Sequence, residues 1–271
     1  MPTRNDILID ESIVMSQLIK LRTDKATGVD EISPRLLSEI KNKVCRPLTM
    51  LFRKSMDTGC VPDDWRSTNV SPIFKKRSRN KSENYRPVSL TSQICRIFES
   101  IMRDTLVKHL ESNNLINETQ HGFRRGRSCL ITLLVFLDKL TRAVDESNDL
   151  DVIYLDFAKA LDKVPHQGLI SKLRQHGLEG KVLEWIKAWL SNRKQRVIVR
   201  GGSSGWRAVT SGVPQGSVLG PLLFLMFNYD IDNGIESLLL KFADDTKIFG
   251  VVEDVVQHQQ LQDDLSKLVN W

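Results

Sequence analysis

The sequence has little cysteine and no paired arrangement of it. Its four cysteines are widely spaced and include no Cys-x-x-Cys pair, which argues against a zinc site and makes disulfide bonds unnecessary. A long apolar run is also missing, because the longest one, Val218 to Phe227, is broken by Gly220 and Pro221 and is too short to span a bilayer. The first residues are too polar for a signal peptide. These absences predict an intracellular protein in a reducing compartment, with no membrane partner.

Internal repeats, low-complexity tracts and long linkers are absent as well. The 271 residues are 41% hydrophobic and 27% charged, which is typical of a globular protein with one large core or two closely packed subdomains. The formal net charge is +6, and the segment from Arg66 to Arg86 alone holds seven basic residues and one acid, Glu83. Such a patch suits a polyanion such as nucleic acid or a nucleoside triphosphate. A solvated basic loop is the alternative interpretation.

Hydrophobic periodicity predicts an α+β protein whose first part is mostly helical. Helices are expected within residues 5–60, capped by Ser33 and Pro34, and at 91–112, 128–144, 166–189 and 255–269. Strands are expected at 70–74, 151–157, 238–242 and 246–251, and a hairpin at 196–210. The segment between 66 and 90 otherwise looks irregular. Trp185 and Trp189 fall on the apolar face of their helix, which predicts a place in the core.

Three acids stand at the ends of predicted strands. Asp156 closes an apolar segment that is rich in β-forming residues and is expected to be a buried strand, and Asp244 and Asp245 lie at the tip of a predicted hairpin. If the strand and the hairpin are neighbours in one sheet, the three carboxylates converge and need cations to neutralise them. Oxygen ligands of this kind favour Mg²⁺, and two such ions about 4 Å apart support nucleotidyl transfer. A polar turn beside a solvated strand end is the alternative, and the acids alone leave both open.

Five motifs in a fixed order surround these acids. They are NYRPVSL (84–90), QHGFRRGRSC (120–129), LDFAKALDKVPH (155–166), SGVPQGSVLGPLLF (211–224) and FADDTKIF (242–249). Together they resemble the reverse transcriptases of non-LTR retrotransposons, in particular the jockey-like class. The resemblance implies an RNA-directed DNA polymerase domain with the fingers and palm of a right-hand polymerase: an antiparallel palm sheet backed by helices, and largely helical fingers.

The resemblance also implies a domain plan. Residues 1–25 would be an N-terminal helical extension, 26–150 the fingers with part of the palm, and 151–271 a palm that stops before the primer grip and the thumb. We therefore expect a missing thumb and impaired activity. The implied partners are an RNA template, a DNA primer, dNTPs and the missing domains of a full-length element protein. The implied cofactor is a pair of Mg²⁺ ions, with Mn²⁺ as a substitute.

The same resemblance assigns roles to individual residues. Asp156 and Asp244 would bind the metal ions, with Asp245 in a supporting role and the backbone carbonyl of Phe157 as a further ligand. The residues implied near the incoming nucleotide are Lys75, Lys76, Arg86, Leu161, Gln215 and Gly216. Those implied at the template or primer backbone are Arg124, Arg125 and Arg127. Glycine at 216 would let the backbone approach a ligand closely.

Two positions depart from the family pattern. Leu161 stands where an aromatic residue usually excludes a 2′-hydroxyl, so weaker rejection of ribonucleotides is expected. Asn228 falls on a helix face expected to be buried, where an unpaired amide costs about 1–3 kcal/mol. These changes keep a second hypothesis open, a non-catalytic retrotransposon remnant that at most binds nucleic acid. Two further alternatives, another palm polymerase and a ferredoxin-like RNA-binding module, agree less well with the motifs and with the three acids.

Overall fold

The computed structural model describes residues 3–117, 119, 120, 122, 126 and 128–271, and they form two compact units. Unit 1 contains residues 1–113 and 161–223, and unit 2 contains residues 114–160 and 224–271. Each unit is therefore built from two separate stretches of chain. The boundaries predicted at residues 25 and 150 separate an N-terminal extension, fingers and palm. They stay predictions, because the two compact units do not test that division. No helix in the described part of the chain is long and apolar enough to cross a membrane.

Helices make up most of unit 1. They are α1 (Glu11–Ile19), α2 (Pro34–Glu39), α3 (Lys41–Thr58), α4 (Asp63–Arg66), α5 (Gln93–Ser112), α8 (His166–Gln175) and α9 (Gly180–Leu190). The predicted cap is confirmed, since Ser33 accepts a hydrogen bond from the backbone of Arg35 ahead of Pro34. The prediction of one helix over 166–189 is wrong. Gly177, with a left-handed φ angle of 77°, follows the end of α8, and Gly180, with a φ angle of 54°, begins α9.

An aromatic cluster forms the core of unit 1. The rings of Phe52 and Phe98 stack with their centroids 4.9 Å apart, and the ring of Trp185 meets Phe98 edge-on at 5.0 Å. The indole nitrogen of Trp185 donates a hydrogen bond of 2.9 Å to Ser55 Oγ. Trp185 and Trp189 are both fully buried, which confirms their predicted place in the core. These aromatic contacts tie α3, α5 and α9 together.

A mixed sheet completes unit 1. Its strands are β1 (Ser67–Phe74), β2 (Tyr85–Thr91), β4 (Arg193–Val199), β5 (Gly202–Ser203) and β6 (Arg207–Val209), in the order β2-β1-β4-β5 with β6 beside β4. The strand predicted at 70–74 and the hairpin at 196–210 are confirmed. Strand β2 was not predicted, because Pro87 interrupts its pattern. Pro87 is tolerated because β2 is an edge strand, and it lies opposite Pro72 in the antiparallel pair β1–β2.

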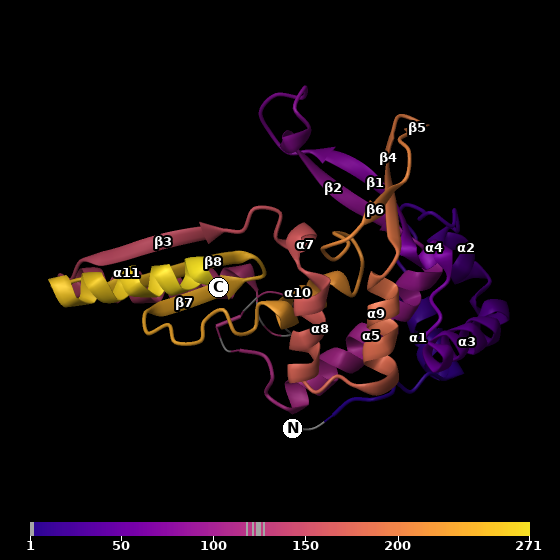
Figure 1. The fold of residues 1–271 in the computed structure, drawn as a ribbon, viewed down its shortest axis with the longest axis horizontal. Helices are drawn as coiled ribbons and strands as arrows, with labels where there is room; N and C mark the ends of the chain where they lie inside the picture. The colour runs from indigo at the N-terminus through magenta and orange to yellow at the C-terminus, as the bar shows by residue number, and fades with distance from the viewer. Residues whose placement is uncertain (1–2, 118, 121, 123–125, 127) are drawn as a thin grey trace. The chain divides into compact units, whose positions relative to one another are not determined.

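Unit 2 is a three-layer arrangement around one antiparallel sheet. Its strands β3 (Leu150–Asp156), β8 (Asp245–Val251) and β7 (Leu238–Phe242) lie in that order. The yellow helix α11 (Val255–Asn270) runs along this sheet (Figure 1) and packs Leu261 and Leu268 on Leu239 and Ile248. Helix α6 (Cys129–Asp145) covers the other face, where its Phe136 meets Leu240 and Phe249. Successive residues of β7 and β8 thus serve opposite faces, as the two-residue period of a strand requires.

The sheet of unit 2 confirms the prediction that the strand ending at Asp156 lies beside the hairpin. The expectation that this strand is buried is wrong. Strand β3 is at the edge of the sheet and its side chains alternate, so that Tyr154 keeps 64% of its surface exposed. Together, the helices and sheets of the two units make the chain a mixed α+β protein, as predicted.

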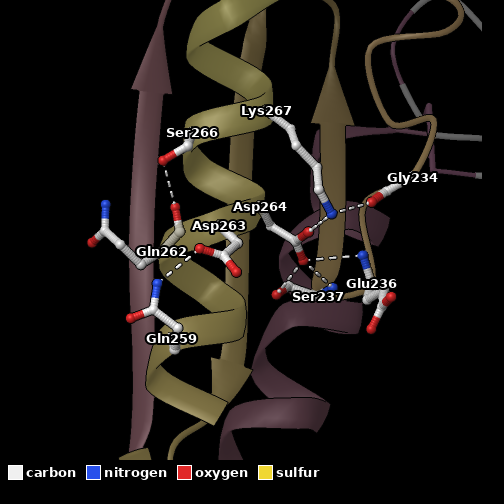
Figure 2. A network of polar contacts seen from close by, with 9 residues as sticks. All are labelled: Gly234, Glu236, Ser237, Gln259, Gln262, Asp263, Asp264, Ser266 and Lys267. Atoms are coloured by element: carbon white, nitrogen blue, oxygen red, sulfur yellow. Dashed lines mark hydrogen bonds and ion pairs between the residues drawn. The ribbon is translucent and has the colours of Figure 1, made fainter. Parts of the chain in front are cut away.

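A buried carboxylate fixes α11 to the segment before β7, as Figure 2 shows. Asp264 Oδ2 accepts hydrogen bonds from the backbone of Glu236 (3.0 Å) and Ser237 (2.8 Å) and from Ser237 Oγ (2.9 Å), and Lys267 Nζ lies 2.9 Å from Oδ1. Burial raises the pKa of Asp264, but hydrogen bonds from Lys267 and Ser237 outweigh it and lower the pKa from 3.8 to about 2. The ionised form is therefore the one that the fold stabilises.

Candidate active site

The strand register of unit 2 brings the three predicted aspartates together. Asp156 ends β3 and is the direct cross-strand partner of Asp245, the first residue of β8. Side chains of such partners lie on one face with their Cβ atoms about 5 Å apart. Asp244 is the second residue of the two-residue turn that is closed by the pair Phe242 and Asp245. One end of the sheet thus carries three carboxylates from two strands and a turn.

Electrostatics at this end favour a bound cation. Burial raises the pKa of Asp245 above its usual value, and the negative charges of Asp244 and Asp156 raise it further. In the described part of the chain, no three His, Cys, Asp or Glu side chains already close around a common metal position. The donor set of three carboxylates nevertheless suits a hard divalent cation such as Mg²⁺. Phe157 follows Asp156 directly, and its ring packs against the core beneath α11.

The turn that carries Asp244 has a strained backbone. Ala243 has a φ angle of +60°, a left-handed conformation that costs a residue with a side chain about 1–2 kcal/mol. The backbone N–H of Ala243 donates to Gln120 Oε1 at 3.0 Å, and its carbonyl accepts from Asn228 Nδ2 at 3.2 Å. Asn228 is thus paired, and the expected cost of an unsatisfied amide does not arise. Sequence reasoning missed both contacts, although Gln120 stands inside one of the five motifs.

The predicted triphosphate residues share one hairpin of unit 1. Arg86 lies on β2 opposite Ile73 of β1, and Lys75 and Lys76 follow directly after β1. Hydrogen bonding between the strands continues beyond β1, because the Lys75 backbone N–H donates to the Asn84 carbonyl at 2.9 Å. All three basic side chains are exposed, and none has an acidic partner within the described residues. The hairpin therefore presents three unneutralised positive charges.

The loop with Gln215 and Gly216 rests on this same hairpin. The backbone N–H of Ser89 in β2 donates to the Gln215 carbonyl at 2.7 Å. Gly216 has a φ angle of +128°, and a Cβ atom added there would lie 2.6 Å from the Ser89 carbonyl oxygen. Close approach to the backbone of β2 therefore requires glycine at 216, whereas the predicted approach to a ligand stays a prediction. The buried Glu99 of α5 supports the loop further along, where Oε2 accepts from the backbone of Val218 (2.7 Å) and Leu219 (3.2 Å).

Leu161 belongs to the same part of unit 1. Its carbonyl accepts a hydrogen bond of 2.7 Å from the backbone of Val213, and Gly212 donates to the Val164 carbonyl at 2.8 Å. Backbone hydrogen bonds thus join the loop of Gln215 to Leu161 on one side, through Val213, and to strand β2 on the other, through Ser89. The roles of these residues in nucleotide binding stay predictions. Glu99 was missed because nothing in the sequence distinguishes it from a surface acid. The predicted nucleic-acid contacts Arg124, Arg125 and Arg127 lie outside the described residues.

Comparisons with known proteins agree with the motifs. Residues 74–271 match the family model described as reverse transcriptase (RNA-dependent DNA polymerase). The chain is similar to a probable RNA-directed DNA polymerase from transposon X-element of Drosophila melanogaster, with 29% identity over 238 residues that cover 86% of this chain and 26% of that protein. It is also similar to the RNA-directed DNA polymerase from mobile element jockey of the same species, with 26% identity over 268 residues, 95% of this chain and 29% of that protein.

A further relative, which matches a shorter stretch of the chain, belongs to another kind of retrotransposable element. The retrovirus-related Pol polyprotein from type-1 retrotransposable element R2 of Popillia japonica is 27% identical over 167 residues, which cover 61% of this chain and 23% of that protein. The chain therefore spans about a quarter of the length of the curated relatives that it matches.

Proposed function

Because this chain belongs to the reverse transcriptase (RNA-dependent DNA polymerase) family, we propose that it contains the fingers and palm of a retrotransposon RNA-directed DNA polymerase. The observation that carries the proposal is the direct pairing of Asp156 with Asp245, with Asp244 in the adjoining turn. An ordinary polar turn explains Asp244 and Asp245 but gives no reason for a third carboxylate opposite them. A divalent-cation centre for nucleotidyl transfer explains all three.

Mg²⁺ is the proposed cofactor, in two copies, with Mn²⁺ as a substitute. Asp156 and Asp244 are the proposed ligands, Asp245 supports them, and the carbonyl of Phe157 is a further donor. When bound there, the ions would supply activation of the primer 3′-hydroxyl and charge stabilisation of the departing pyrophosphate. The protein's own contribution is to hold three acceptor groups at one sheet end, where their mutual repulsion already disfavours the metal-free ionised state.

Binding of dNTPs is the proposed role of unit 1. Lys75, Lys76 and Arg86 supply positive charge from one hairpin, and Arg86 offers a planar fork for bidentate phosphate contact. Gln215 and Gly216 hold their loop against β2, the strand that also carries Arg86, and we assign this loop to the nucleotide as well. The side chain of Leu161 takes the place of the aromatic residue that selects the sugar. The proposed polymer partners are an RNA template and a DNA primer.

Primer extension on an RNA template tests this function. The purified chain is incubated with Mg²⁺ and with dNTPs or rNTPs, beside the variants Asp244→Asn and Asp263→Asn. Asp263 is an exposed residue of α11 whose side chain accepts a hydrogen bond from Gln259, so its variant removes the same charge away from the turn. We expect extension by the wild type and by Asp263→Asn, and none by Asp244→Asn. Extension that survives in Asp244→Asn contradicts the proposed centre.

Failure of the wild type to extend a primer, with the protein shown to be folded, has a different meaning. It favours the second hypothesis, a retrotransposon remnant that at most binds nucleic acid. A titration of the folded chain with a labelled RNA–DNA hybrid at several salt concentrations then measures what binding remains. Each phosphate contact contributes about 0.9 to the slope of log affinity against log salt.

A further inference from the structure

The turn of unit 2 that carries Asp244 is not stabilised by its own sequence. Two-residue hairpin turns with a left-handed first position usually have glycine there, because a side chain destabilises that conformation. This chain has Ala243 at that position, with a φ angle of +60°. A strained conformation of this kind persists only where the surrounding structure determines it. The contacts that hold the turn must therefore come from elsewhere in unit 2.

Two buried amide side chains provide these contacts. Gln120, which is 4% exposed, accepts from the Ala243 N–H at 3.0 Å, and Asn228, which is 2% exposed, donates to the Ala243 carbonyl at 3.2 Å. Both polar groups of the strained peptide are thus bonded to side chains that are distant in sequence. A buried polar group that loses its hydrogen-bond partner costs free energy, so these two bonds favour this one conformation of the turn.

The two amides are themselves held in place. Gln120 Oε1 also accepts from the Gly122 N–H at 2.7 Å, and the backbone of residue 120 pairs in parallel with Lys241 of β7. A Cβ atom at position 122 would lie 2.4 Å from the Ala243 nitrogen, so only glycine allows this approach. Asn228 directly follows α10 (Gly220–Phe227), and its backbone N–H donates to the Phe224 carbonyl at 3.0 Å.

We propose that Gln120 and Asn228 are positioning residues, which fix the strained turn at Ala243 and thereby hold Asp244 beside the Asp156–Asp245 pair. The proposal rests on the proposed function, since it assigns Asp244 to a divalent-cation centre. Both amides would act through the backbone of Ala243 and not as metal ligands. Groups that orient a metal ligand in this indirect way commonly change metal affinity by about 10–100-fold when removed.

The test uses near-isosteric variants of the whole chain. Gln120→Met removes the acceptor, and Asn228→Leu removes the donor. Thr246→Val is the matched control, because its buried Oγ1 in β8 has no hydrogen-bond partner within the described residues. Hydrogen exchange, measured by mass spectrometry on the peptide containing residues 242–245 in the absence of metal, reports how stably the turn keeps its conformation. Titration with Mn²⁺ alone, followed by the paramagnetic resonance of the free ion, reports the affinity of the centre.

We expect exchange of the turn to be at least about tenfold faster in Gln120→Met and in Asn228→Leu, and Mn²⁺ affinity to fall about tenfold or more. Thr246→Val should match the wild type in both measurements. Unchanged exchange overturns the proposal, and so does faster exchange with unchanged Mn²⁺ affinity, which would leave the amides a purely structural role. If the wild type binds Mn²⁺ no more tightly than Asp244→Asn does, the proposed function is contradicted. The exchange rates would then still show whether Gln120 and Asn228 fix the conformation of the turn.

Discussion

Replacing Asp264 by asparagine should destabilise unit 2 by removing one buried charge. Its Oδ2 accepts three hydrogen bonds, two from backbone N–H groups and one from Ser237 Oγ, while Oδ1 lies 2.9 Å from Lys267 Nζ. An amide cannot satisfy both sides. If its oxygen faces the three donors, its NH₂ group faces the Lys267 ammonium, and the reverse orientation leaves three donors unpaired.

The pKa of Asp264 sets the expected magnitude. It is lowered from 3.8 to about 2 in the folded chain, and each pKa unit corresponds to about 1.4 kcal/mol, so ionisation of this buried group contributes about 2 kcal/mol at neutral pH. Because the folded pKa is the lower one, the contribution is complete well above pH 3.8. It is lost as the pH falls toward 2, where the carboxylate is protonated in the folded chain as well.

Urea unfolding followed by circular dichroism measures the effect, with the wild type, Asp264→Asn and Asp263→Asn compared between pH 7 and pH 2.5. Hydrogen exchange over residues 255–270 locates the loss in α11. We expect Asp264→Asn to lower the free energy of unfolding by about 2 kcal/mol at pH 7, and the gap to the wild type to shrink in acid. The exposed Asp263 should change it by less than about 0.5 kcal/mol. A gap below that value at pH 7, or one that stays constant down to pH 2.5, refutes the reasoning.

Three further substitutions test other parts of the structure. Trp185→Ala should lower the free energy of unfolding by about 3–5 kcal/mol in urea titrations, because it leaves a cavity in the aromatic core of unit 1 and removes the donor to Ser55 Oγ. A loss below about 1 kcal/mol would be inconsistent with that packing. Gly216→Ala should weaken dNTP binding at least about tenfold in equilibrium titrations, since its Cβ would lie 2.6 Å from the Ser89 carbonyl, and an unchanged Kd would show that the loop tolerates a side chain. Leu161→Phe should raise the preference for dNTPs over rNTPs at least about tenfold in single-nucleotide primer extension. If the wild type and the variant show the same preference, position 161 has no part in sugar selection.

Local patterns predicted most of the elements, because apolar spacing and capping residues act within a few positions of one another. The helix predicted over 91–112 and found at 93–112, the two strands around Asp244 and the cap at Ser33 are examples. Prediction failed at two places where the deciding interaction was not local, and at a third where two helix-breaking glycines were overlooked. Strand β2 exists because β1 pairs with it despite Pro87, and the break between α8 and α9 follows from left-handed glycines inside an otherwise continuous apolar stripe. The exposure of Tyr154 depends on which strand lies at the edge of its sheet.

The candidate site divides in the same way. Its three acids and Arg86 stand inside short motifs that resemble one family, so the sequence by itself determined the candidate residues and the chemistry expected of them. Their support did not follow from those motifs. Gln120 and Asn228 are separated from Ala243 by 123 and 15 positions, and only the folded sheet brings their amides to its backbone. Tertiary structure decided how Asp244 is held, because a strained turn depends on hydrogen bonds from segments that are distant along the chain.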